Sequence, residues 1–279
     1  MSGGLPFKGT CSGARSAWVA TLGVGIFAGL IVAAPSAAAP DPKRIVGGDL
    51  ADPGDWPYAA ALTYRGSQYC GGTVISANSV LTAAHCVAGG GIPRVRVITG
   101  RPDLRDTGTG QSIRIDRVFI HPGYDRVGDQ DLAVLRLQDD TVATPATLPT
   151  HEEDAADTDP GDPLRVAGWG SRTRRGARPS MTLRETAQHP VEARRCRRKF
   201  HHFTARTQIC TRGDEMAPGA VTTSCYGDSG GPLIFDAPAA DLIVGVVSYG
   251  GRKCGEAKPT VYARVAAGLG FIKQKAHIP

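Results

Sequence analysis

The sequence lacks the features that define several protein classes. No CxxC pair occurs among its seven cysteines, so the usual cysteine spacing of a zinc module is missing. The longest uncharged apolar run, residues 18–32, is about fifteen residues long, whereas a membrane-spanning helix needs ~20. Between residues 56 and 80, no helical periodicity competes with the short apolar runs that glycine interrupts. These absences argue against a zinc module, a membrane anchor and a helical fold.

The N-terminus has the pattern of a secretory signal. Lys8 and Arg15 precede the apolar run, and small residues fill positions 33–39. We predict a signal peptide over 1–39 and a short pro-segment over 40–44; a membrane anchor is the alternative. Residues 1–44 contain four basic residues and one acidic one, so their removal lowers the net charge from +6 to about +3. That charge does not indicate a nucleic-acid partner, and we expect a secreted, extracellular protein with no membrane contact after processing.

Secretion changes how the cysteines are interpreted. Cys11 lies in the signal, which leaves an even number, and in an exported chain this pattern indicates disulfides. Six cysteines allow fifteen pairings, which the residues alone do not resolve. Cys196 with His201 and His202 is the nearest approach to a metal-ligand cluster. We predict no metal and no cofactor.

The most informative stretch runs from Ser224 to Pro232. Ser229 stands between Asp228 and Gly230, and Gly227 allows a tight turn. A serine hydroxyl becomes a nucleophile when a base takes its proton and backbone amides stabilise the oxyanion, here those of Gly227 and Ser229. Taken alone, the stretch could also be an ordinary glycine-rich turn.

Other segments supply a candidate base for such a serine and a carboxylate to orient that base. His85 follows an apolar run, and the adjacent Cys86 could close a loop to Cys70. Asp131 leads directly into the apolar run 132–135, which suits a buried carboxylate that orients a histidine.

A dibasic pair at residues 43–44 precedes Ile45. Cleavage after Arg44 would create an ammonium group on Ile45, and a buried ammonium needs a carboxylate partner, for which Asp228 is the candidate. The alternative is a dibasic pair without proteolytic meaning.

The rest of the chain reads as short strands in two halves. Residues 94–98 and 112–120 alternate apolar with polar side chains, as in a sheet with one wet face. Residues 139–163, rich in Asp, Thr, Ala and Pro, read as a solvated connection, and 268–276 as a short helix. Basic clusters at 172–178 and 194–199 indicate either a polyanion-binding face or ordinary solvated surface.

With these motifs in order, the sequence resembles the trypsin/chymotrypsin-like serine proteases from Ile45 to its C-terminus. The resemblance implies an all-β fold of two antiparallel six-stranded Greek-key barrels, over 45–155 and 156–279, with a short C-terminal helix. It also implies an endopeptidase acting through an acyl-enzyme. It assigns the catalytic triad to His85, Asp131 and Ser229, the oxyanion hole to Gly227 and Ser229, the activation salt bridge to Ile45 and Asp228, and the disulfides to Cys70–Cys86, Cys196–Cys210 and Cys225–Cys254.

The substrate pocket departs from the pattern of trypsin itself. The resemblance places Ser248, Tyr249 and Gly250 along the bound substrate, and Thr223 where trypsins have an aspartate. A neutral Thr223 cannot compensate the desolvation of a buried cation, and Thr260 in place of glycine should shorten the pocket. We predict a small or medium uncharged residue before the scissile bond, and therefore activation by a separate, basic-specific protease.

Two other functions were weighed. A catalytically silent binding protein on the same fold could use the basic clusters, but such proteins usually lack part of the triad. An esterase or lipase of another fold would have a different nucleophile motif, with its histidine after the serine. Asp103 and Asp106 lie among arginines, which argues against a calcium site. We expect a monomer that acts on polypeptide substrates.

Overall fold

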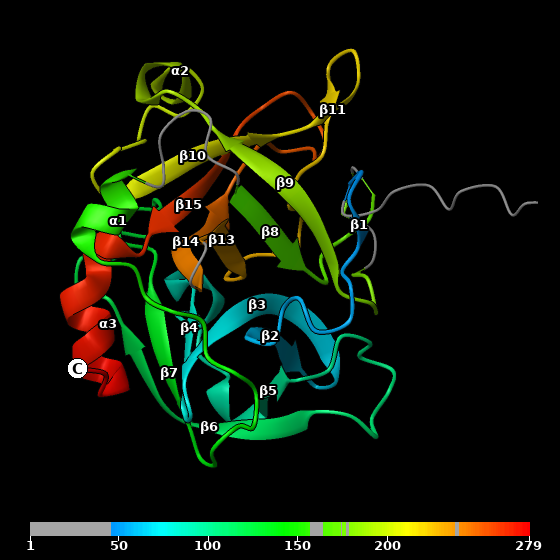
Figure 1. Cartoon of the computed structure of the whole chain (residues 1–279), viewed down its shortest axis with the longest axis vertical. Helices are drawn as coiled ribbons and strands as arrows, with labels where there is room; N and C mark the ends of the chain where they lie inside the picture. Colours follow the sequence, from blue (N-terminus) through cyan, green and yellow to red (C-terminus); the bar gives the residue numbers. More distant parts are fainter. Residues whose placement is uncertain (1–45, 157–163, 174, 177–178, 238–239) are drawn as a thin grey trace, which may run out of the picture. The chain divides into compact units, whose positions relative to one another are not determined.

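The computed structural model describes residues 46–156, 164–173, 175–176, 179–237 and 240–279. The predicted signal peptide, the pro-segment and Ile45 lie outside the described residues. The described part is almost entirely β-structure, and each of its helices is too short or too polar to cross a membrane. Figure 1 shows the strands and the few helices.

The first half of the chain closes into a six-stranded antiparallel barrel. Its strand order is β2-β3-β4-β7-β6-β5, and β5 pairs back with β2. Apolar side chains such as Leu62, Leu81 and Leu135 are fully buried inside it. The strands are β2 (Ala59–Tyr64), β3 (Ser67–Ser76), β4 (Ser79–Thr82), β5 (Val95–Thr99), β6 (Gln111–Ile120) and β7 (Ala133–Leu137).

The second half repeats the same arrangement. Its strands follow the order β8-β9-β10-β15-β14-β13, and β13 pairs with β8 to close the ring. Leu233, Ile243 and Tyr262 are among its fully buried side chains. The strands are β8 (Leu164–Gly168), β9 (Arg184–Pro190), β10 (Gln208–Gly213), β13 (Pro232–Asp236), β14 (Asp241–Tyr249) and β15 (Thr260–Arg264). The prediction of two six-stranded barrels is therefore confirmed.

Both ends of the described chain cross to the other barrel. The short strand β1 (Asp49–Leu50) pairs with β9 of the second barrel, although it precedes the first. The predicted C-terminal helix is present as α3 (Leu269–Ala276), and it packs against β7 and β4 of the first barrel (Figure 1). Its Ile272 is fully buried there. These crossings tie the two halves together.

The connection between the barrels contains a helix that the composition did not reveal. Helix α1 (His151–Ala156) begins with a capping box, because Glu153 N donates to Thr150 Oγ1 and Thr150 N donates to the Glu153 carboxylate. The predicted boundary at 155/156 falls within this helix. The second barrel also carries α2 (Ala193–Arg197) and the small hairpin β11 (Glu215–Ala217) and β12 (Ala220–Val221).

Candidate active site

The histidine and the aspartate are positioned by one pair of strands. β4 pairs with β7 so that Thr82 lies opposite Ala133. His85 follows β4 in a short 3₁₀ turn, and Asp131 stands two residues before β7. The register of this one ladder therefore brings both side chains to the same edge of the first barrel.

Asp131 is buried and accepts three hydrogen bonds. Its Oδ2 lies 2.7 Å from His85 Nδ1 and 2.6 Å from Ser248 Oγ, and its Oδ1 accepts from His85 N at 2.9 Å. A buried carboxylate is tolerated when its lone pairs are satisfied in this way. Because an ionised carboxylate only accepts, the His85 proton is held on Nδ1, and Nε2 keeps its lone pair.

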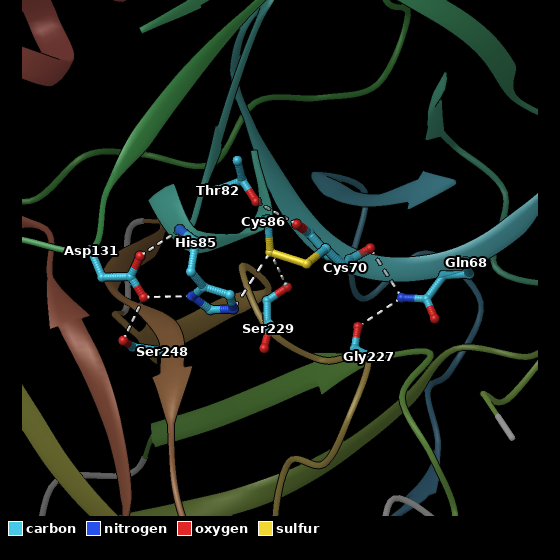
Figure 2. The surroundings of a disulfide bond; sticks show 10 residues. Gln68, Cys70, Thr82, His85, Cys86, Asp131, Gly227, Ser229 and Ser248 are labelled. Carbon is cyan, nitrogen blue, oxygen red and sulfur yellow. Dashed lines mark hydrogen bonds and ion pairs between the residues drawn. A yellow bond between two sulfur atoms is a disulfide. The ribbon is translucent and has the colours of Figure 1, made fainter. Parts of the chain in front are cut away.

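Ser229 lies on the opposite side of the His85 ring from Asp131 (Figure 2). The two residues also share a neighbour, since Cys86 Sγ is 3.8 Å from His85 Nε2 and 3.6 Å from Ser229 O. Ser229 O accepts from Gly71 N of β3 at 2.7 Å, which fixes the serine loop on the first barrel. A Cβ on Gly71 would stand 3.0 Å from the Gly231 backbone, so a larger residue would push against the serine loop.

Some backbone amides around Ser229 donate hydrogen bonds within the protein, and others do not. Asp228 N donates to Cys225 O, and Gly230 N donates to Val247 O. In the described part of the chain, no hydrogen bond uses Gly227 N or Ser229 N. These are the two amides predicted for the oxyanion hole, and both remain available to an incoming oxygen.

Gln68 is a residue that the sequence interpretation missed. Its side chain is buried, and its Nε2 donates to Gly227 O at 2.7 Å and to Cys70 O at 3.0 Å (Figure 2). It therefore clamps the peptide that follows Gly227 to the strand that carries Cys70. A long polar side chain near the start of β3 was the available signal, but its partner lies 159 residues away in the chain.

Asp228 is fully buried beside the serine. It accepts from Gly170 N and Cys225 N, each at 2.7 Å. Burial raises its pKa to about 6, although both amide bonds favour the charged form. A Cβ on Gly170 would come within 2.3 Å of the carboxylate, so only glycine fits there. The predicted partner of this carboxylate, the Ile45 amine, lies outside the described residues.

A hollow of about 310 Å³ adjoins Ser229. The predicted pocket residues Thr223, Ser248, Tyr249, Gly250 and Thr260 all line it. Two buried hydroxyls, Thr223 Oγ1 and Thr260 Oγ1, meet at 2.9 Å. The only carboxylate among the lining residues is that of Glu256, which lies 3.6 Å from Lys258 Nζ.

The described part of the chain contains three disulfides, and two of them, Cys70–Cys86 and Cys225–Cys254, cross-link segments that form the site. The three bridges join Cys70 to Cys86, Cys196 to Cys210 and Cys225 to Cys254, which are the pairs that the resemblance implies. Both sulfurs of the first bridge lie close to a His85 nitrogen. Their engagement in a disulfide removes them as thiolate ligands for a metal.

Two Greek-key barrels with a serine beside a histidine–carboxylate pair form the arrangement of the two-barrel serine endopeptidases. The family model described as Trypsin matches residues 45–272. The chain is 33% identical to "Trypsin" of Saccharopolyspora erythraea over 226 residues, which cover 80% of this chain and 94% of the relative. It is 32% identical to "Chymotrypsin-C" of Bos taurus over 277 residues, which cover 92% of this chain and all of the relative. The chain belongs to the trypsin family and is a serine endopeptidase.

Proposed function

We propose that the protein hydrolyses peptide bonds through a triad of Ser229, His85 and Asp131. The observation that carries this proposal is the hydrogen bond between His85 Nδ1 and the buried Asp131, which leaves Nε2 free on the side of Ser229. Asp131 orients the ring and stabilises the imidazolium that forms during catalysis.

The reaction follows from these groups. Ser229 Oγ attacks the scissile carbonyl carbon while His85 Nε2 takes its proton, and the Gly227 and Ser229 amides stabilise the resulting oxyanion. The C–N bond then breaks as His85 returns the proton to the leaving amine, which produces the acyl-enzyme. Water repeats the sequence, releases the acid and restores Ser229.

We propose that the pocket selects a small or medium uncharged residue before the scissile bond. The Thr223–Thr260 contact supports this, because two hydroxyls that already hydrogen-bond to each other offer no charge to a substrate cation. Gly250 faces Thr260, since a Cβ added at Gly250 would lie 3.7 Å from Thr260 Oγ1. Thr260 therefore limits the depth of the pocket, whereas the wall at Gly250 stays open.

We propose that the chain is secreted as an inactive precursor, works as a monomer, and is activated when another, basic-specific protease cuts after Arg44. The new Ile45 ammonium would pair with Asp228. Two contacts support this: Thr223 N donates to Val46 O at 3.2 Å, and Val46 is buried beside the Cys225–Cys254 bridge. The second residue after the cut is therefore already hydrogen-bonded to a residue of the pocket.

The test is digestion of an unbiased peptide library by protein cut after Arg44, with the Ser229→Ala chain as control and mass spectrometry as the readout. Cleavage after small or medium uncharged residues, absent from the control, is the expected result. Cleavage after Arg or Lys would overturn the pocket assignment and leave the triad intact. A cut protein that cleaves no peptide would favour the silent binding protein instead.

A further inference from the structure

A basic hollow lies on the second barrel, separate from the hollow beside Ser229. It measures about 300 Å³ and is lined by Arg195, Arg198, Lys199 and Arg212, with an apolar part made by Val191, Ala257 and Pro259. None of the described residues that line it is acidic. It belongs neither to the proposed triad nor to the proposed substrate pocket.

The hollow is built on a fixed support. The Cys196–Cys210 disulfide ties α2 to β10, and Arg212 lies two residues beyond Cys210 in β10. Figure 1 shows the two elements on the second barrel. Beneath the helix, Phe203 and Val261 pack around this bridge. The cations of α2 and of β10 therefore face one another across a rigid frame.

The basic residues of α2, and the two that follow it, do not all line the hollow. Arg195, Arg198 and Lys199 are spaced by three and four residues, which places them on one side of a helical turn, and these three line the hollow. Arg194 instead binds Glu192, whose carboxylate also interacts through space with the charges of Arg195 and Arg198 but forms no ion pair with either in the described part of the chain. Arg197 is exposed but does not line the hollow.

The positive charge of the hollow is poorly compensated. In the described part of the chain, Arg195, Arg198 and Lys199 form no ion pair with a carboxylate, and Arg212 reaches Glu215 only at 4.0 Å. Arg212 Nε is buried and has no hydrogen-bond partner among the described residues. Four cationic side chains that line one hollow are suited to tetrahedral oxyanions, which arginine recognises through paired N–H groups.

We propose that this hollow is a binding site for a polymer of sulfate or phosphate esters. It goes beyond the proposed peptidase activity and does not depend on it. Ala257 and Pro259 alternate along the chain with Lys258 and Thr260, which line the hollow beside Ser229. The anion site therefore lies on the reverse side of a wall of the proposed substrate pocket.

The experiment uses the full chain with Ser229→Ala, so that no proteolysis interferes. Binding of inorganic polyphosphate and of dextran sulfate is titrated over a series of salt concentrations, with poly-glutamate as the carboxylate comparison. The double variant Arg195→Gln/Arg198→Gln is compared with Arg197→Gln/Arg206→Gln, which removes the same charge from exposed residues outside the hollow. Thermal midpoints verify that all variants are folded.

We expect binding of at least one ester polymer, and the two polymers distinguish a phosphate from a sulfate source. The hollow variant should bind about tenfold more weakly, with a shallower salt dependence, and the charge-matched control within about twofold. Equal losses in both variants would show diffuse attraction and overturn the site. Absence of binding to both polymers, or equally tight binding of poly-glutamate, would also overturn the proposal.

Discussion

The two barrels have the same strand order but contribute to the site in different ways. The first barrel supplies His85 and Asp131 from the ends of two paired strands, so the register between β4 and β7 sets their geometry. The second barrel supplies Ser229 from a loop, and the pocket from loops together with the ends of β14 and β15; the Cys225–Cys254 bridge cross-links these loops. The comparison teaches that one half of the site is determined by sheet pairing, whereas the other depends on cross-links and glycines.

The strongest test of the first-barrel half is Asp131→Asn. The amide would preserve the shape of the side chain but favour the wrong histidine tautomer, and we expect kcat to fall about ten-thousandfold. Peptide hydrolysis by cut protein measures the effect. Ser248→Ala, which removes one of the hydrogen bonds to Asp131, serves as a milder comparison. A loss of less than tenfold for Asp131→Asn would contradict the role given to this carboxylate.

The second-barrel half is tested by opening the pocket. Thr260→Gly should let longer side chains enter, and the ratio of kcat/KM values for a medium and a small residue should rise by about 10–200-fold. Adding Thr223→Asp to this variant should favour Arg and Lys, because the carboxylate compensates their desolvation. The readout is the same peptide library. An unchanged preference would show that the Thr223–Thr260 contact does not limit the pocket.

The contact between the two halves is tested by Gln68→Leu. This change removes the donor to Gly227 O but keeps a side chain of similar size, so kcat should fall about tenfold with little change in KM. Gln111→Leu is the matched control, because its Nε2 bonds a surface carbonyl far from the serine loop. Equal losses in both variants would point to a general effect of glutamine removal rather than to positioning of Gly227.

The smallest expected effect concerns pH and the stability of the uncut chain. Burial raises the pKa of Asp228 to about 6, so its protonated form is favoured in the fold. This contribution to the stability of the fold is fully present below about pH 4 and is lost as the pH rises through about 6. The reason is that, as the pH rises, the carboxyl ionises in the unfolded chain before it ionises in the folded chain. Cutting after Arg44 should remove this loss by providing an ammonium partner.

Thermal unfolding of the Ser229→Ala chain before and after the cut, between pH 4 and 8, measures this difference. The uncut form should be the less stable above pH 6, and Asp228→Asn should flatten its pH dependence. If both forms melted alike at every pH, the proposed salt bridge would be wrong.

Much of this organisation was predictable from the sequence. The motifs around His85, Asp131 and Ser229 are local patterns of a few residues, and the family resemblance that they carry implied the two barrels. The bond from Gln68 to Gly227 was not predictable, since its partners are far apart and only the folded barrels bring them together. Likewise, the basic clusters revealed charge, but only the Cys196–Cys210 frame shows which arginines of 194–199 face a common hollow. The capping box of α1 is visible in the sequence, but the polar composition around it favoured a connection without a helix.

Activation is tested most directly by the rate at which an organophosphorus fluoride labels Ser229, before and after the cut at Arg44. We expect slow labelling of the uncut chain, and labelling faster by several orders of magnitude once Ile45 is free to pair with Asp228. The predicted gain should vanish in Asp228→Asn, while the His85–Asp131 pair is unaffected. Equal labelling of the cut and uncut chains would contradict the view that the second-barrel loop is the half of the site that activation completes.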